Sequence, residues 1–192
     1  MLLYLHGFES SPASQKIGHT RQFLETQQAA VRFEAPQQPA SMASIQQLLE
    51  HYIEQAEHPT AVMGSSLGGF WTHYVVSRLK QRGKQVRGVL INPAVRPLAW
   101  MPPQAHQRVH PYTREKYWLG PQDAEVLAAA QAALRDDVEL LVLLQAADEV
   151  LDARIAQERY SSQRMILEQG GDHSFQNFPR YLPAVLEFLG VL

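Results

Sequence analysis

Ser66 is the residue of this chain whose surroundings most strongly suggest covalent chemistry. Residues 64–68 read Gly-Ser-Ser-Leu-Gly, so Ser66 has a glycine two positions to either side. This G-x-S-x-G pattern is typical of a nucleophile elbow, a sharp strand-to-helix turn that strains the serine backbone and points its hydroxyl into a cleft. The context fits, because residues 60–63 resemble a short buried strand and residues 70–80 have the period of a helix. We therefore predict that Ser66 is a nucleophile.

A histidine that could activate this serine follows near the end of the chain. A serine hydroxyl is a poor nucleophile until a base removes its proton, and the base needs a third group to fix its tautomer and orientation. After an elbow of this kind, the acid and then the histidine are expected at the carboxyl ends of later strands. His173 follows the last predicted strand, within Gly-Gly-Asp-His-Ser-Phe at 170–175. We predict that His173 is the base.

The predicted acid is Asp148, the first carboxylate after the apolar run 140–144. This position places its side chain at the end of the sheet. Glu149 and Asp152 are the other candidates in the same loop, and Asp152 is better suited to cap the next helix. Asp172 would point elsewhere in an extended loop and is expected to form a turn.

The remaining histidines are expected to have other roles. His73 lies two turns beyond Ser66 and is predicted to pack in the core. His106 and His110 precede the predicted acid, which breaks the expected order. Three more lie on or beside predicted helical surfaces, where we expect them to be solvated: His19, His51 and His58.

Two backbone amides are predicted to stabilise the oxyanion of a tetrahedral intermediate. One is the N–H of Leu67, at the positive end of the helix that follows Ser66. The second is expected from the loop after the first strand. Residues 6–8 read His-Gly-Phe at this place, so the N–H of Phe8 is the predicted donor. The alternative for this tripeptide is a plain turn from strand to loop.

Strand-like and helix-like segments alternate six times along the chain. Apolar runs predict strands at residues 2–5, 30–33, 60–63, 86–91, 140–144 and 165–167. Helical periodicity and capping residues predict helices from Ser14 to about Gln28, from Ser41 or Ser44 to Ile53, and over 70–80, 121–134, 152–160 and 178–189. This alternation argues for an α/β fold with a parallel sheet covered on both faces by right-handed crossovers.

Residues 93–120 fit no regular element. The stretch is rich in proline and aromatic residues, has no stable period and is longer than most connecting loops. It could merely cover one end of the sheet. Two of the three tryptophans of the chain lie in it, so we favour the interpretation that this stretch covers a binding pocket.

Composition and charge limit the possible classes of function. A chain of 192 residues with 45% hydrophobic content suits one domain, spanning residues 1–192. The net charge is −2 and the Lys and Arg residues are scattered, so neither nucleic acid nor a membrane is expected as a partner. The absence of cysteine excludes disulfides and thiolate metal sites. The first residues lack the features of a secretion signal or a membrane span, so we expect a cytoplasmic protein.

Five segments together resemble the YqiA-like esterases, which are small α/β-hydrolases of the bacterial cytoplasm. They are residues 6–11, 64–69, 92–97, 148–152 and 170–175. The resemblance covers almost the whole chain. The elbow and the histidine loop are shared with many hydrolases, so 92–97 and 148–152 are the specific markers.

The resemblance implies an α/β-hydrolase fold, a three-layer αβα sandwich with a mostly parallel six-stranded sheet in the order 2-1-3-4-5-6 and a lid-like insertion at about 93–120. It implies a carboxylesterase-type serine hydrolase that acts on small esters of simple, short to medium acyl chains without metal or cofactor. The nucleophile, acid and base positions of the family fall on Ser66, Asp148 and His173. Glu9 departs from the family pattern, which has a small or amide residue there, and a carboxylate facing the cleft would disfavour anionic substrates.

Other functions stay open. The same three residues could act as an acyl thioesterase (an acyl-CoA hydrolase), a peptidase or a lactonase. A hydrolase-like module that binds a ligand or a partner without turnover is the alternative outside enzymes, since a fold does not fix a function.

Overall fold

Six parallel strands form the central sheet of the computed structural model, which describes residues 1–55 and 57–192. In spatial order they are β2 (Phe33–Glu34), β1 (Leu2–Leu5), β3 (Ala61–Ser65), β4 (Arg87–Ile91), β7 (Glu139–Gln145) and β8 (Arg164–Glu168). Each neighbouring pair is parallel. Since β7 and β8 are the fifth and sixth strands of this sheet along the chain, the predicted order 2-1-3-4-5-6 is confirmed.

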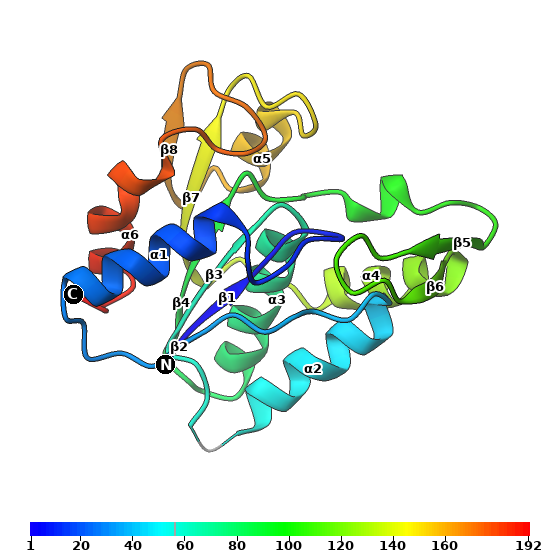
Figure 1. Cartoon of the computed structure of the whole chain (residues 1–192), viewed down its shortest axis with the longest axis horizontal. Helices are drawn as coiled ribbons and strands as arrows, with labels where there is room; N and C mark the ends of the chain where they lie inside the picture. The colour runs from blue at the N-terminus through cyan, green and yellow to red at the C-terminus, as the bar shows by residue number, and fades with distance from the viewer. Residues whose placement is uncertain (56) are drawn as a thin grey trace.

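Helices cover both faces of the sheet, as Figure 1 shows. One face carries α1 (Gln15–Thr26), the 3-10 helix η2 (Phe178–Tyr181) and α6 (Leu182–Phe188). The other carries α2 (Met42–Glu54), α3 (Leu67–Gln81), α4 (Pro121–Ala132) and α5 (Ala153–Arg159). The predicted three-layer αβα sandwich is therefore confirmed.

Alternation along the strands explains the two cores of the sandwich. Successive side chains of a strand point to opposite faces of a sheet. In β1, Leu3 and Leu5 join the core under α2 to α5, and Leu2 and Tyr4 join the core under α1 and α6. All four side chains are fully buried. The continuous apolar runs of the sequence thus reflect burial on both faces of a parallel sheet.

Most predicted bounds agree with the structure to within two residues, and the larger differences lie at the second strand, at the helix after Ser66 and at the last helix, which is divided into η2 and α6. The strand predicted at 30–33 is wrong, because β2 consists of Phe33 and Glu34 alone. The N–H of Val31 donates to Ala29 O at 2.8 Å, so a tight turn occupies the start of that apolar run. Helix α3 begins at Leu67, three residues before the predicted start at 70, because its first turn contains two glycines that carry no apolar period.

The stretch 93–120 contains a 3-10 helix and a β-hairpin that its sequence did not predict. The 3-10 helix η1 spans Pro97–Trp100, and the antiparallel hairpin pairs β5 (His106–Val109) with β6 (Lys116–Leu119). Tyr117 and Leu119 are buried while Trp118 is exposed. The alternation covers only the four residues of β6, and all four residues of β5 are exposed, so neither strand has a period long enough to be recognised. Figure 1 shows the hairpin beside the loop that follows β1.

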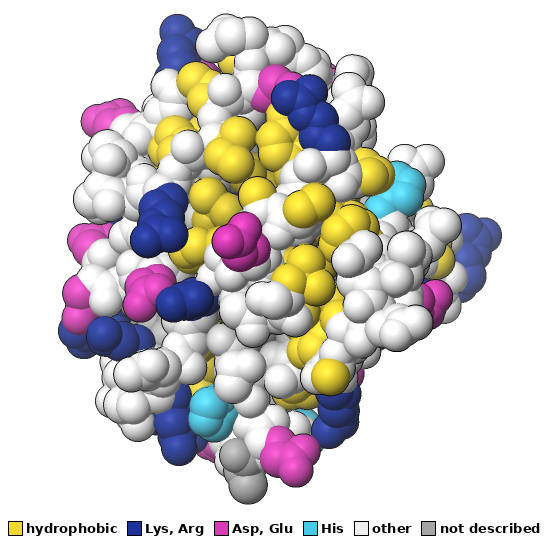
Figure 2. Space-filling view, turned by 90° about the vertical axis from the view of Figure 1, so that its left-hand side faces the viewer, with side chains coloured by type: hydrophobic (Ala, Val, Ile, Leu, Met, Phe, Trp, Pro, Cys, Tyr) yellow, Lys and Arg dark blue, Asp and Glu magenta, His cyan; other side chains and the backbone are white. Residues whose placement is uncertain are grey.

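The surface over α1 and α6 carries charges of both signs. Figure 2 shows Lys and Arg side chains interspersed with Asp and Glu and with hydrophobic side chains on this face, without a basic stripe. Within 1–55 and 57–192, none of the helices combines the length and the apolar content that crossing a bilayer requires.

Candidate active site

Ser66 occupies the strained turn between β3 and α3. Its backbone has φ 57° and ψ −123°, a combination that residues with a side chain rarely adopt. The two glycines of the motif permit this turn, because a Cβ on Gly64 would lie 2.3 Å from Gly68 O and a Cβ on Gly68 would lie 2.0 Å from Leu5 O. The chain therefore has the geometry expected of a nucleophile elbow.

The structure brings Ser66, His173 and Asp148 together at the carboxyl ends of the strands. His173 Nε2 lies 3.1 Å from Ser66 Oγ. Its Nδ1 lies 2.8 Å from Asp148 Oδ2 and 3.0 Å from Oδ1. The Asp148 side chain is 1% exposed and the His173 side chain 24% exposed. A hydroxyl, an imidazole and a carboxylate thus form a continuous hydrogen-bonded chain that opens to solvent at the histidine.

The loop after β7 holds the Asp148 carboxylate in place. Oδ1 also accepts hydrogen bonds from the N–H groups of Val150 at 2.9 Å and Leu151 at 2.8 Å. Glu149 does not reach the imidazole and instead accepts the backbone N–H of His173 at 3.0 Å. Asp152 caps α5, as predicted, by accepting Arg154 N–H at 3.0 Å. Of the three carboxylates in this loop, Asp148 is the one that contacts the imidazole.

Two buried amides that sequence reasoning missed hold the histidine loop. Asn92 Nδ2 donates to Asp172 O at 3.0 Å and to His173 O at 3.4 Å. Gln145 Oε1 accepts the N–H groups of Asp172 at 3.0 Å and Gln176 at 2.8 Å. Each amide follows or ends an apolar strand, and that placement of a polar residue at a sheet end is the signal that could have revealed them.

The sequence analysis also did not identify the role of Lys16. Its Nζ donates to Ser174 O at 2.7 Å, which ties α1 to the histidine loop. Burial lowers the pKa of Lys16, and the neighbouring carboxylates of Asp172 and Asp148 oppose this shift. The ammonium group therefore supports the loop from the face opposite to α3.

One predicted oxyanion donor, Leu67, directly follows the serine, and the other, Phe8, belongs to a loop that passes beside the serine at Gly7. Leu67 is the first residue of α3, where backbone N–H groups lack partners within the helix. Gly7 lies so close to Ser66 that an added Cβ would be 3.3 Å from the serine Cβ. The amide of Phe8, the next residue, is therefore near the serine as well.

His6 fixes the direction of the Phe8 amide. Its Nε2 accepts the N–H of Gln38 at 3.1 Å, so Nδ1 carries the proton and donates to Gly7 O at 2.9 Å. The carbonyl of Gly7 and the N–H of Phe8 belong to one planar trans peptide and point in opposite directions. Burial lowers the pKa of His6, which favours the neutral ring that this pattern requires.

Glu9 does not present a free carboxylate. Its oxygens accept hydrogen bonds from Arg108 and Tyr117 of the β5–β6 hairpin, and its side chain is 16% exposed. The expectation that Glu9 repels anionic substrates assumed a carboxylate that faces the cleft. In the structure this carboxylate is paired with Arg108, whose guanidinium compensates its charge.

The histidines other than His173 and His6 take mixed positions. His73 is buried, as predicted, and lies 2.8 Å from Arg135 O and 3.3 Å from the hydroxyl of Tyr160. His51 is exposed, while His19 and His58 are half-buried rather than solvated. His110 is buried in the hairpin turn and accepts the N–H of Thr113 at 3.1 Å.

A pocket of about 330 Å³ adjoins the site on the side of the segment after β4. It is lined mostly by apolar side chains, among them Pro93, Val95, Ala99, Trp100, Leu151 and Ile155. Ala94, between the lining residues Pro93 and Val95, donates its N–H to the backbone O of Ser66 at 3.0 Å, and Leu151 N–H donates to Asp148 Oδ1 at 2.8 Å. Both walls are therefore adjacent to the residues of the hydrogen-bonded chain.

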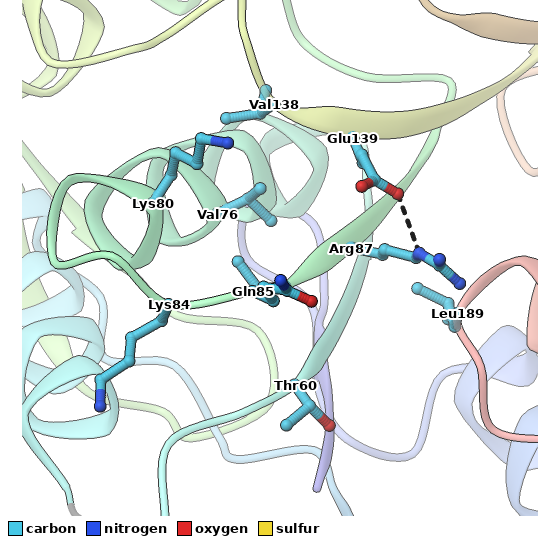
Figure 3. A pocket seen from close by; sticks show the side chains of 10 residues that line it. Thr60, Val76, Lys80, Lys84, Gln85, Arg87, Val138, Glu139 and Leu189 are labelled. Carbon is cyan, nitrogen blue, oxygen red and sulfur yellow. Dashed lines mark hydrogen bonds and ion pairs between the residues drawn. The ribbon is translucent and has the colours of Figure 1, made fainter.

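A second pocket, of about 300 Å³, lies at the opposite end of the sheet. Figure 3 shows Lys80 and Lys84 on one side of this pocket and Arg87, which donates to Glu139 at 2.9 Å, on the other. Because it is formed where β3, β4 and β7 begin, it is separated from Ser66 by the length of these strands. In the described part of the chain, no three His, Asp or Glu side chains cluster closely enough to hold a metal ion.

Solved structures with esterase, lipase and hydrolase titles share this fold. Alpha/beta hydrolase domain-containing protein 10 from mouse is 15% identical, with a TM-score of 0.70 over 97% of this chain and 87% of the other. A monoacylglycerol lipase from Paleococcus ferrophilus is 13% identical, with a TM-score of 0.69 over 98% and 93%. Est1E from Butyrivibrio proteoclasticus is 14% identical, with a TM-score of 0.67 over 97% and 85%. These likenesses show that the chain has the α/β-hydrolase fold.

The family of the chain follows from its sequence. The resemblance to the YqiA-like esterases is based on short segments spread from residue 6 to residue 175. Residues 1–190 match the model of the family described as "Uncharacterised protein family (UPF0227)", and the chain therefore belongs to this YqiA-like family.

Proposed function

We propose that the protein is a serine esterase that hydrolyses carboxylic esters of simple acyl chains. The observation that carries this proposal is the continuous contact from Ser66 Oγ through His173 to Asp148, at 3.1 Å and 2.8 Å. Along the chain the nucleophile comes first, the orienting acid second and the base third, each at the carboxyl end of a strand. This is the order and placement that the α/β-hydrolase fold uses for acyl transfer.

In the first step, Ser66 Oγ attacks the carbonyl carbon of the ester while His173 Nε2 takes the hydroxyl proton. The amides of Leu67 and Phe8 donate to the oxyanion of the tetrahedral intermediate. When the carbon–oxygen bond to the alcohol breaks, the imidazolium returns its proton to the leaving alkoxide. Asp148 holds the Nδ1 proton and stabilises the positive charge on the ring.

In the second step, His173 takes a proton from a water molecule that attacks the acyl-serine ester. A second tetrahedral intermediate uses the same two amides, and Ser66 Oγ leaves as it regains the proton from the imidazolium. The products are a carboxylic acid and the free enzyme. The apolar pocket beside Pro93 and Leu151 is of the size class of small-ligand sites and suits the acyl chain.

Replacement of the serine tests the proposal. Ser66→Ala should lower kcat for p-nitrophenyl butyrate by at least on the order of 10³-fold, because no nucleophile remains. The variant should also lose labelling by a fluorophosphonate probe. Ser65→Ala, which removes the neighbouring hydroxyl in the same turn, should keep the label. Undiminished turnover by Ser66→Ala would contradict the proposal.

Two neighbouring functions are separated by the choice of substrate. Rates on an ester, a thioester and an amide with the same acyl chain distinguish an esterase from a thioesterase or a peptidase, since the three leaving groups differ. A binding module without turnover would leave Ser66 unlabelled by the fluorophosphonate. The exposed edge of His173 and its contact with Ser66 favour catalysis over that alternative.

A further inference from the structure

Glu9 has an unusual backbone next to the proposed oxyanion donor. It directly follows Phe8 and adopts φ 50°, in the left-handed region that few residues other than glycine use. Such a conformation persists where surrounding contacts over-determine it. The contacts of the Glu9 side chain are therefore candidates for what holds the loop.

Both strands of the β5–β6 hairpin donate hydrogen bonds to the Glu9 carboxylate. Arg108 on β5 donates from Nε to Oε1 at 2.9 Å and from Nη2 to Oε2 at 2.7 Å. Tyr117 on β6 donates its hydroxyl to Oε1 at 2.7 Å. Arg108 and Tyr117 are paired directly opposite each other in the hairpin. A bidentate guanidinium–carboxylate pair fixes direction as well as distance, so the hairpin sets the orientation of Glu9.

The hairpin also contacts the side chain of Phe8, whose N–H is one of the two predicted oxyanion donors. The guanidinium carbon of Arg108 lies 5.8 Å from the ring centroid of Phe8. A cavity of about 10 Å³ is lined by Phe8, Glu9 and Leu67, by residues 38–40 and Ile45, and by His110 of the hairpin turn. This space holds about one water at most, so His110 lies close to the loop after β1.

The Phe8 amide is thus held from both sides in the sequence. On its N-terminal side, His6 binds the carbonyl of Gly7 and so fixes the peptide plane. On its C-terminal side, Arg108 and Tyr117 bind Glu9. The hydrogen bonds from Arg108 also hold the pKa of Glu9 below its usual value, which keeps the carboxylate ionised at neutral pH.

We infer that Glu9 and Arg108 are positioning residues: their ion pair fastens the β5–β6 hairpin to the loop after β1 and thereby aims the Phe8 amide at the oxyanion. The inference rests on the proposed esterase function. It assigns the hairpin the role of a rigid support on the oxyanion side of the site, so that the geometry of the loop depends on Arg108, which lies 99 positions from Glu9 in the sequence.

The central experiment compares Arg108→Gln with Lys116→Gln. Both remove one positive charge from the hairpin, but Lys116 is an exposed cation of β6 outside the Glu9 contact. On p-nitrophenyl butyrate, Arg108→Gln should lower kcat by about tenfold or more with KM changed by less than about threefold, since losing an oxyanion donor outright costs about 10²- to 10³-fold. Lys116→Gln should leave both constants unchanged.

Inhibition by butylboronic acid provides a readout that a purely structural role would not change. The boronate forms a tetrahedral adduct with the serine and so resembles the intermediate. Its Ki should rise in Arg108→Gln by the same factor by which kcat/KM falls. All rates are measured well below the unfolding temperature of each variant, so that loss of folded protein does not contribute.

Three further variants separate geometry from charge. Arg108→Lys keeps the charge but cannot form the bidentate contact, so it should restore only part of kcat. Glu9→Gln and the double variant Glu9→Gln/Arg108→Gln should lose about as much as Arg108→Gln alone, because the two side chains act as a unit. If Arg108→Gln does not fold, Tyr117→Phe removes one hydrogen bond and should show a smaller loss of kcat with the same rise in boronate Ki.

Two outcomes overturn the inference. One is an unchanged kcat in Arg108→Gln and Glu9→Gln, and the other is a loss confined to KM without a change in boronate Ki. Failure of the proposed function has a different signature, since the wild-type protein would then neither hydrolyse the ester nor react with the fluorophosphonate.

Discussion

Asn92 Oδ1 accepts the backbone N–H of Gln145 at 3.0 Å, and this contact joins the carboxyl ends of β4 and β7. The same Asn92 side chain donates to Asp172 O, and the side chain of Gln145 accepts the N–H of Asp172. One loop residue is thus held on both of its backbone polar groups by two neighbouring strands. Because His173 follows immediately, the position of its imidazole depends on these buried amides.

Gly171→Ala should reduce catalysis through Gln145. A Cβ at this glycine would lie 2.1 Å from Gln145 Oε1, and its backbone has φ +76°. The side chain of Gln145 must then move and release the N–H groups of Asp172 and Gln176. We expect kcat to fall by about tenfold or more, because displacements near 1 Å in a catalytic group cost up to about 10²-fold.

Gly170→Ala is the matched control for this substitution. Gly170 has φ +80°, but nothing lies within 4 Å of its added Cβ. It should therefore lose about 1 kcal/mol of unfolding free energy from backbone strain and keep its kcat within about twofold. Equal kcat values for the two variants, measured together with urea unfolding curves, would refute the role of Gln145.

Asp148→Asn should lower kcat on the order of 10³- to 10⁴-fold. An amide at this position can donate to His173 Nδ1 and so favours the tautomer that cannot accept the serine proton. Asp152→Asn makes the same chemical change four residues later, where asparagine still caps α5. Its rate should stay within about fivefold of wild type. Steady-state kinetics of both variants decide which carboxylate orients the histidine, and a larger loss in Asp152→Asn would exclude Asp148.

Filling the apolar pocket should shorten the preferred acyl chain. Ala99 lines this pocket, so Ala99→Trp should lower kcat/KM for p-nitrophenyl octanoate by about tenfold or more, since each methylene excluded from an apolar site costs about 1 kcal/mol or more. The acetate ester should change by less than about twofold. Lys84→Trp places the same side chain in the pocket at the opposite end of the sheet and should affect neither ester. Equal losses on both esters in Ala99→Trp would show that the acyl chain binds elsewhere.

The sequence predicts the sheet and the residues around Ser66 well because the signals there are local. A buried parallel strand is a short apolar run, and the elbow is a five-residue pattern whose glycines are required by close contact with Leu5 O and Gly68 O. The chain order of serine, acid and histidine then follows from the topology of the fold. Each of these features can be recognised without knowing which distant residues meet.

The residues that the sequence did not predict act through distant contacts. Asn92, Gln145 and Lys16 hold the histidine loop from three separate elements, and no local period marks a polar side chain as a support for a loop. The role of the β5–β6 hairpin also depends on a distant contact, because Arg108 and Tyr117 bind Glu9, which follows β1. A contact between residues 9 and 108 depends on the packing of the whole molecule.

His73 should make the stability of the protein depend on pH. Burial lowers its pKa to about 4, compared with 6.5 for an exposed histidine. Between these values the unfolded chain binds a proton that the folded chain does not, so the folded state loses stability as the pH falls from 6.5 to 4. The contribution amounts to about 3 kcal/mol. In urea unfolding at pH 7, 5.5 and 4.5, the stability of wild type relative to His73→Gln should decrease steadily as the pH is lowered. A constant difference between wild type and His73→Gln over this pH range would contradict the buried neutral ring.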